Sequence, residues 1–319
     1  MGSGFMKRMT IFSPKQQTSG VALVTVLLIV SIATVLVVSM SSKQYFSIRA
    51  QGNLQANVQG WQYVISLEQW ATAVLNRDAR ENKTDGVNDA WQQGIPETEV
   101  EQAFIAAKIS DLQGRLNLNN LIRNNELSQV DYEVFQRLFS ELGIDASILN
   151  AIVDWIDADS EPLYPGGAED DYYMALKPGM RTANQSVFQV EELQDIKGMT
   201  IEVYNKLIPH VSALPGYQTV NVNTASDKVL MALTKDLTQG DADSLIAYRE
   251  GQVIDNIEEW HKLPQFASRE VDASLVGTNS NFFGLDNYVK TEKYMMTVFT
   301  ALQRENGVTR VQYRQKRGY

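Results

Sequence analysis

The chain has 319 residues, enough for about two domains beyond any membrane segment. Its formal charge of −10 disfavours a nucleic-acid partner, because phosphate binding requires clustered cations. It contains no cysteine, which excludes disulfides, Cys-ligated metals and thiol catalysis, and its only histidines are His210 and His261. The sequence also lacks nucleophile-elbow, phosphate-loop, zinc-protease and dinucleotide motifs, so it does not indicate an enzyme.

The N-terminal region combines a basic leader with an uncharged apolar run. Lys7, Arg8 and Lys15 are the only charged residues in 1–20, and residues 21–42 contain none. Twenty-two residues of helix rise about 33 Å, which is enough to cross a bilayer core. The basic leader should keep the N-terminus cytoplasmic and place the rest of the chain on the other side of the membrane.

A helical pattern continues beyond the apolar run. Large apolar residues recur at spacings of three to five at Leu54, Val58, Trp61, Ile65, Trp70 and Val74. This pattern predicts an amphipathic helix that reaches about Asn76 and packs on a sheet. A cleaved secretory signal with a weak site near Ser41, and a plain unprocessed anchor, are the alternatives, but a signal predicts no such continuation.

Strands are expected on both sides of a helical region. The segment 103–121 alternates in polarity and should form one or two strands that turn near Gly114. Near the C-terminus, EKYMMTVFTALQR and VTRVQYRQKR flank Asn306-Gly307, a dipeptide typical of a hairpin turn. The intervening residues 122–285 are mostly helical in pattern.

Two helices are expected at the start of this region. The first covers 128–143, opening with Ser128 as a cap and closing at Gly143, and the second covers 145–159. The order of elements therefore predicts a helix-plus-sheet domain interrupted by an inserted helical domain.

An acidic cluster follows the second predicted helix. Seven carboxylates fall within 18 residues, at Asp154, Asp157, Asp159, Glu161, Glu169, Asp170 and Asp171. The turn-forming stretch 162–167 allows 169–171 to fold back toward 157–161. Calcium, which takes six to eight oxygen ligands, would offset the repulsion between these groups. Pro162 and Ala168 exclude an EF-hand, and a solvated acidic loop or a catalytic carboxylate pair are the other interpretations.

Residues 219–263, with a weaker copy at 193–214, resemble the helix-hairpin-helix units of DNA-uptake receptors. Those units carry flanking cations, whereas residues 121–290 contain 27 Asp and Glu against 12 Lys and Arg. We therefore expect no nucleic acid to bind. The region is instead predicted to be a structural scaffold in which Asn221, Asn223 and Thr224 cap and turn the chain.

Taken together, these features resemble the type IV pilin-like class, and in particular the K-type minor pseudopilins of type II secretion systems. The resemblance rests on Gly20 before the apolar run, on Thr25 where most pilins carry Glu, and on the motifs SDLQGRLNLNNL, DWIDADSEPLYPGGAEDDYY and VNVNTASDKVLMAL. It implies an α+β fold in which a long N-terminal transmembrane helix packs on a small antiparallel sheet. It also implies an inserted all-α domain with helix-hairpin-helix or SAM-like units that holds structural calcium.

The resemblance further implies processing and a division of the chain. Prepilin peptidase would cleave after Gly20 and leave Val21 as an N-methylated N-terminus. The segments would be a leader (1–20), a transmembrane helix (21–42), the pilin-like helix and first strands (43–121), the inserted domain with its calcium loop (122–285) and the closing strands (286–319). Whether Met1 or Met6 is the natural start stays open.

The implied function is that of a non-enzymatic subunit at the tip of the pseudopilus, which helps initiate its assembly and the export of folded proteins. Without a carboxylate at Thr25, the subunit would lack the usual contact to a subunit above it. The implied partners are the I-, J- and H-type minor pseudopilins, the major pseudopilin, prepilin peptidase and the inner-membrane assembly platform. The expected location is the inner membrane, with the C-terminal domain in the periplasm. The alternative is an anchored periplasmic binding module, like a DNA-uptake receptor, that does not polymerise.

Overall fold

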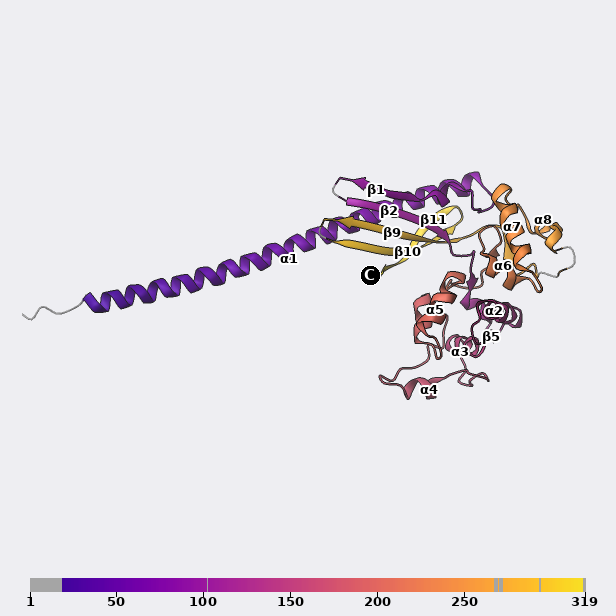
Figure 1. The fold of residues 1–319 in the computed structure, drawn as a ribbon, viewed down its shortest axis with the longest axis horizontal. Coiled ribbons are helices and arrows are strands. Elements are labelled where there is room, and N and C mark those ends of the chain that lie inside the picture. The colour runs from indigo at the N-terminus through magenta and orange to yellow at the C-terminus, as the bar shows by residue number, and fades with distance from the viewer. Residues whose placement is uncertain (1–18, 102, 267–268, 270–271, 293, 318–319) are drawn as a thin grey trace, which may run out of the picture. The chain divides into compact units, whose positions relative to one another are not determined.

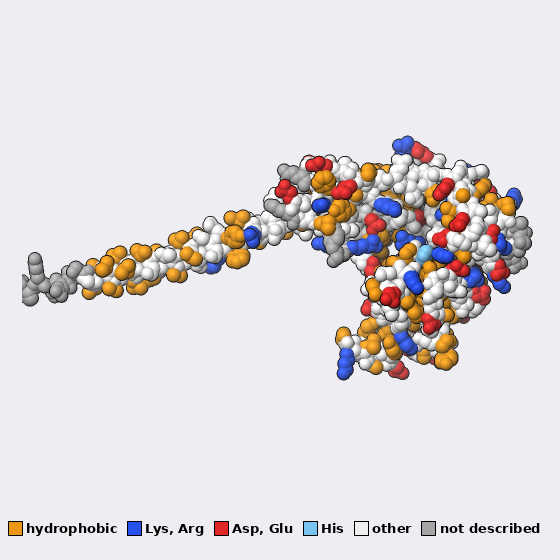
Figure 2. Space-filling model, in the orientation of Figure 1, with side chains coloured by type: hydrophobic (Ala, Val, Ile, Leu, Met, Phe, Trp, Pro, Cys, Tyr) orange, Lys and Arg blue, Asp and Glu red, His pale blue; other side chains and the backbone are white. Residues whose placement is uncertain are grey.

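The computed structural model describes residues 19–101, 103–266, 269, 272–292 and 294–317. The leader predicted at 1–20 therefore lies almost entirely outside the described residues. Helix α1 spans Ser19–Glu81, five residues beyond the predicted end at Asn76. Of the helices in the described ranges, it alone is long and apolar enough to cross a membrane, with a mean hydropathy of 3.1 in its most apolar window. Figure 2 shows the hydrophobic side chains that cover its N-terminal part.

The C-terminal part of α1 packs on a five-stranded antiparallel sheet with strand order β1-β2-β9-β10-β11 (Figure 1). Val64, Leu67, Ala71 and Leu75 form its buried stripe, because they recur at helical spacing on one face. The strands are β1 (Ile95–Val100), β2 (Ala103–Asp111), β9 (Phe282–Thr291), β10 (Met295–Glu305) and β11 (Val308–Arg317).

The predicted strands are present with different limits. β2 ends at Asp111, because the rest of the segment predicted at 103–121 turns away and pairs only through two-residue strands. β1 was not predicted, and β9 begins inside the range 122–285 that was expected to be helical, although it ends within the predicted closing strands at 286–319. The C-terminal hairpin is confirmed: Asn306 and Gly307 have φ angles of 52° and 74°, the positive values that its tight turn requires.

The connection between β2 and β9 holds the remaining helices (Figure 1). They are α2 (Gln129–Leu142), α3 (Ser147–Ile156), α4 (Asp170–Met174), α5 (Ile201–Leu207), α6 (Asp227–Leu233), α7 (Gln239–Gly251) and α8 (Ile257–Lys262). α2 matches the predicted helix 128–143, and Gly143 ends it in the left-handed conformation. α3 ends three residues before the predicted position, because Asp157 is extended.

Short elements complete this connection. The 3₁₀ helices are Leu118–Leu121 (η2), Val190–Asp195 (η3), Ile208–His210 (η4) and Pro264–Phe266 (η5), and η1, Ala90–Gln93, precedes β1. Three two-stranded sheets join β3 (Leu116–Asn117) with β6 (Val211–Ser212), β4 (Ile122–Arg123) with β5 (Glu126–Leu127), and β7 (Val220–Asn221) with β8 (Val276–Gly277).

The inserted segment has its own hydrophobic core. One buried cluster includes Phe135, Phe139, Tyr173 and Trp260 and draws its members from the segment between Leu116 and Val276. A second cluster joins α1 to the sheet and includes Trp91 and Phe283. The helical insertion is therefore packed as a domain, and it leaves and re-enters the sheet at neighbouring points, since Asp111 pairs with Phe283.

Asparagine side chains fasten the insertion to the sheet. Asn221 is fully buried, and its Nδ2 donates to the Asp85 carbonyl at 3.0 Å and to Asp111 Oδ2 at 2.9 Å. Thr224 Oγ1 donates to the same Asp111 oxygen at 2.6 Å. Asn223 accepts from the backbone N–H of Ile254 and donates to its carbonyl, both at 3.0 Å. The N-cap of α6 is Ser226, so the predicted capping role of these three residues is wrong. Asn221 does turn the chain, because its Oδ1 accepts the backbone N–H of Asn223 at 3.0 Å, and the other contacts join distant segments.

The motif that follows β2 works in the same way. Asn117 Oδ1 accepts from the Leu214 backbone N–H at 2.9 Å, while Asn119 Nδ2 donates to the Leu214 carbonyl at the same distance. Asn120 binds both backbone groups of Gln218. These side chains satisfy buried backbone groups that no regular strand pairs, which stabilises the start of the insertion.

Candidate functional site

Three carboxylates of the predicted acidic cluster come together in the loop between α3 and α4. Asp157 and Asp159 follow the end of α3, whereas Glu169 lies directly before α4. Each offers one oxygen atom, and the three atoms lie within 4.8 Å of one another. The chain thus folds back so that 169 approaches 157–159, as the turn-forming stretch between them allows.

Asp154 organises this loop from the last turn of α3. Its buried carboxylate accepts the backbone N–H of Ala168 at 2.7 Å and that of Leu163 at 3.1 Å. Gly167 is required there, because a Cβ atom at this position would lie 2.2 Å from Asp154 Oδ2. Asn150 Nδ2 adds a hydrogen bond to the Pro165 carbonyl at 2.8 Å. Bonds to α3 therefore hold the loop at both of its sides.

The three carboxylates are electrostatically unfavourable without a cation. Glu169 is only 6% exposed, and neither of its carboxylate oxygens accepts a hydrogen bond from a described residue. Burial, reinforced by the charges of Asp154 and Asp157, raises the pKa of Glu169 to about 7. Burial and the neighbouring Asp159 and Asp154 raise the pKa of Asp157 to about 6. Buried oxygens without partners and an all-oxygen donor set fit a hard cation such as Ca²⁺.

The other predicted ligands lie outside this group of three. Glu161 is exposed, and its backbone N–H donates to Asp159 Oδ1 at 2.8 Å. Asp170 Oδ1 accepts from the N–H and hydroxyl of Thr182 at 3.0 and 2.9 Å. Asp171 is exposed in the first turn of α4. Asp154 and Asp170 are thus committed to hydrogen bonds that shape the loop.

A second acidic group, which no sequence pattern had indicated, already contains its counter-ion. Asp78, Asp85 and Asp89 also bring oxygen atoms within 4.8 Å of one another. Arg304 of β10 lies among them, with Nη2 2.7 Å from Asp85 Oδ1 and Nη1 3.1 Å from Asp78 Oδ2. This group is therefore a buried ion-pair network that fastens the end of α1 to the sheet.

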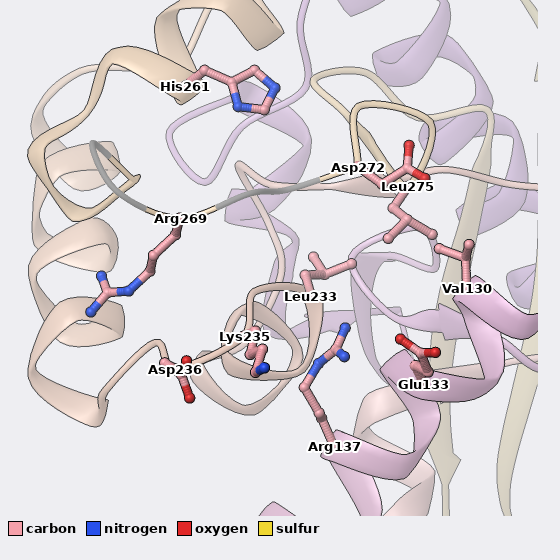
Figure 3. A pocket seen from close by; sticks show the side chains of 10 residues that line it. All are labelled: Val130, Glu133, Arg137, Leu233, Lys235, Asp236, His261, Arg269, Asp272 and Leu275. Carbon is pink, nitrogen blue, oxygen red and sulfur yellow. The ribbon is translucent and has the colours of Figure 1, made fainter.

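A wide pocket of about 780 Å³ opens on the helical domain (Figure 3). Charged groups of both signs surround it, including Glu133, Arg137, Lys235, Asp236, His261 and Arg269. Arg269 is paired with Asp241 at 2.9 Å, and Arg137 Nε donates to the Ala232 carbonyl at 2.6 Å. The labelled side chains in Figure 3 do not converge on one point, so they indicate neither a catalytic pair nor a particular class of ligand.

Comparisons with known proteins match most of the chain to one family. Residues 114–216 and 220–279 each match a family described as "Type II secretion system (T2SS), protein K". Type II secretion system protein K of Pseudomonas aeruginosa is 32% identical over 310 residues, which cover 93% of this chain and 92% of that protein. The protein of the same name from Klebsiella pneumoniae is 37% identical over 216 residues, covering 64% and 66%.

A solved structure has the same fold. It is a crystal structure of the GspK-GspI-GspJ complex of the enterotoxigenic Escherichia coli type 2 secretion system. The matched chain superimposes with a TM-score of 0.75 at 24% identity, and the match covers 84% of this chain and 99% of that one.

An apolar N-terminal helix whose C-terminal part packs on an antiparallel sheet, matched by protein K relatives, defines a minor pseudopilin of the type II secretion system. More specifically, the chain belongs to the type II secretion system protein K family.

Proposed function

We propose that this minor pseudopilin occupies the tip of the pseudopilus and helps to initiate its assembly and the export of folded proteins across the outer membrane. The main support is the insertion of a separately packed helical domain between β2 and β9. A domain of this size on the side of a pilin-like sheet would obstruct the packing of subunits stacked above it. In this role the chain acts as an assembly component and not as an enzyme.

Thr25 provides independent support. Its hydroxyl donates to the Ala22 carbonyl at 2.9 Å, a bond within the helix itself. The side chain therefore presents no anionic group to the N-terminal amine of another subunit. A carboxylate in the bilayer would be costly at a tip, where no subunit above could neutralise it.

We infer maturation and location from the sequence. The chain would be cleaved after Gly20 and methylated at Val21 by prepilin peptidase. α1 would then anchor it in the inner membrane, with the sheet and the helical domain in the periplasm. The matched structure is a complex with GspI and GspJ, so I- and J-type minor pseudopilins are the proposed immediate partners of this chain. The H-type and major pseudopilins and the assembly platform would complete the machinery.

Calcium would stabilise the loop between α3 and α4. Asp157, Asp159 and Glu169 would bind the ion, while Asp154 holds the loop backbone in place. The ion would supply the positive charge that three adjacent carboxylates need to remain ionised. Its role would be structural, because the ion would fix the loop that joins α3 to α4.

The region 219–263 is proposed to be a helix-hairpin-helix-like scaffold that binds no nucleic acid. α6 and α7 are joined by a short connection and pack against each other, as in such a unit. Thr238 caps α7, and the paired Asp241 occupies the position where a phosphate-binding unit would offer free amides. The acidic balance of this domain disfavours phosphate contacts.

The decisive test is where the chain lies in assembled pseudopili. A peptide-tagged full-length chain, expressed with the major and the other minor pseudopilins, should give antibody label at one end of each filament. Label along the shaft would reject a tip position. Co-purification should recover the I- and J-type subunits, whereas recovery of the chain alone, together with a DNA mobility shift at low salt, would favour the uptake-receptor alternative.

A further inference from the structure

A small cavity separates the sheet from the inserted domain on the sheet face opposite α1. Its volume is about 220 Å³. Ser110, Leu112, Arg115, Phe299 and Tyr313 line it from the sheet side, and Ser212 of β6 is among the residues that line it from the insertion. Phe299 lies on the face opposite α1, because its neighbour Val298 belongs to the core beneath the helix and successive side chains alternate.

Arg115 is the principal polar group of this cavity. Its guanidinium group forms no hydrogen bond and no ion pair with any described residue, although the side chain is partly buried. Burial lowers the pKa of Arg115, and the charges of Asp286 and Asp111 oppose this shift. The guanidinium remains charged in spite of that shift, and a partly buried cation without a hydrogen-bonding partner is unfavourable. An anion bound beside Arg115 would therefore be stabilised.

Ser212 supplies a second unpartnered group. This residue is only 3% exposed, and its Oγ has no hydrogen-bond partner among the described residues. A buried hydroxyl without a partner is destabilising, so its presence here needs an explanation. A ligand atom in the cavity would accept the hydroxyl proton.

The other charged groups around the cavity leave Arg115 available. Arg317 Nη1 binds Asp286 Oδ1 at 2.8 Å, and its guanidinium carbon lies 4.5 Å from the centre of the Phe299 ring. Asp286 is therefore already paired. Glu191 lines the insertion side of the cavity and forms no ion pair with a described cation. An anion at Arg115 would thus find an unpaired cation, whereas the charge of Arg317 is balanced by Asp286.

An apolar hollow adjoins the cavity. It has a volume of about 240 Å³ and shares Leu112, Ala213, Leu214 and Tyr313 with the cavity. Phe188 lines this hollow, stacks on Tyr313 with ring centres 5.1 Å apart, and remains largely exposed. A ligand that fills both spaces must combine a negative group with an apolar group.

We propose that the cavity and hollow bind an acidic peptide segment of another protein, in which a carboxylate side chain precedes a large apolar side chain. The carboxylate accepts hydrogen bonds from the guanidinium of Arg115 and from Ser212 Oγ. The apolar side chain packs against Leu214 and Tyr313. This site does not depend on the position of the chain in the pseudopilus.

Binding can be measured with short peptides and the full-length chain in detergent. The probe is acetyl-Glu-Phe-Leu-amide, and the matched control is acetyl-Gln-Phe-Leu-amide, which differs only in charge. Equilibrium dialysis should show that the glutamine peptide binds about tenfold more weakly or worse, as expected for loss of a charged hydrogen bond. Equal binding of both peptides would overturn the proposal. So would competition by acetate at the same concentration as the peptide, because the apolar part would then contribute nothing.

Variants place the binding site on the molecule. Arg115→Gln should weaken binding of the glutamate peptide about tenfold or more, whereas Arg181→Gln, whose side chain is 78% exposed on the helical domain, should leave it unchanged. If Arg115→Gln does not fold, Ser212→Ala replaces it. This variant should melt at a higher temperature than the parent without peptide, because it removes a buried unpaired hydroxyl, and should still bind the peptide more weakly. Unchanged peptide binding by the folded variants would reject this site.

Discussion

Glu68 of α1 and Arg314 of β11 form two parallel hydrogen bonds. Arg314 Nε lies 2.7 Å from Glu68 Oε1, and Nη2 lies 2.8 Å from Oε2. Thr300 of β10 donates to the same Oε1 at 2.8 Å, and Glu68 is only 3% exposed. This pair fixes the last strand of the sheet to the helix that carries the membrane segment.

Loss of Arg314 should therefore weaken the pilin-like part of the molecule. Arg314→Gln leaves the Glu68 carboxylate buried with one weak donor, and we expect the free energy of unfolding to fall by about 1–3 kcal/mol. The range allows for solvent screening, since the Arg314 side chain is 42% exposed. Urea unfolding of the full-length chain in detergent measures this free energy of unfolding. Arg310→Gln on the same strand, which breaks no ion pair with a described residue, should change it little, and an equal loss in both variants would contradict the role of the pair.

Calcium should stabilise the chain through Glu169. Adding Ca²⁺ should raise the melting temperature of the helical domain and a chelator should lower it, because the ion neutralises three adjacent carboxylates. Glu169→Gln should remove most of this difference. Glu161→Gln, at an exposed carboxylate outside the group, should retain it. A melting temperature that does not respond to calcium in the parent chain would reject the site.

In chelator, stability should fall as the pH rises. The folded-state pKa of Glu169 is about 7 against an ordinary value of 4.5, so the folded chain binds more protons than the unfolded chain between these values. The contribution of protonated Glu169 to the free energy of unfolding is complete below about pH 4.5 and is lost as the pH rises through 7. The free energy of unfolding falls by up to about 1.4 kcal/mol per pH unit in this range. Asp157, with a pKa of about 6, acts in the same direction. Melting curves from pH 5 to 7.5 should show this slope, and Glu169→Gln should flatten it; a slope of opposite sign would contradict the raised pKa.

A carboxylate at position 25 should impair a tip subunit. At the proposed tip position, Thr25→Glu would place an anion in the apolar part of α1 without a subunit above to neutralise it. We expect less secretion of a reporter substrate and fewer pseudopili, at unchanged cellular levels of the chain. Thr25→Ala removes only a hydroxyl that is bonded within the helix, and it should behave as the parent does. Normal secretion with Thr25→Glu would show that the missing carboxylate has no role in tip placement.

Asn221 should be more important for stability than a surface asparagine. Asn221→Ala removes the donor that joins the Asp85 carbonyl, Asp111 and Ser280 Oγ, leaving buried acceptors with fewer partners. We expect a loss of about 2–4 kcal/mol in the free energy of unfolding. Asn88→Ala, at an exposed site with a single hydrogen bond to the Glu250 carbonyl, should cost less than about 1 kcal/mol. Similar losses in both variants would indicate that Asn221 has no special role in joining the inserted segment to the sheet.

Local patterns were the most reliable guide to the fold. The apolar stripe of α1, the Asn306-Gly307 hairpin and the helix ending at Gly143 depend on neighbouring residues, and the structure has all three. β1 was not predicted, because Ile95–Val100 is polar and exposed at a sheet edge and has no alternating apolar face. The start of β9 was missed because its first four residues are all buried, which removes the alternation that marks a half-buried strand.

The amino-acid sequence was sufficient to define the membrane helix, the inserted helical region, the acidic loop and the family, because these depend on composition, short-range spacing and motifs. Three-dimensional packing was needed to establish which acidic residues meet. Packing places Asp157, Asp159 and Glu169 together, directs the hydrogen bonds of Asp154 to the loop backbone, and pairs Asp85 with Arg304. It also left Arg115 without a partner among the described residues. The physical reason is that Coulombic and hydrogen-bond partners are set by distance in space, and packing brings together groups that are far apart along the chain.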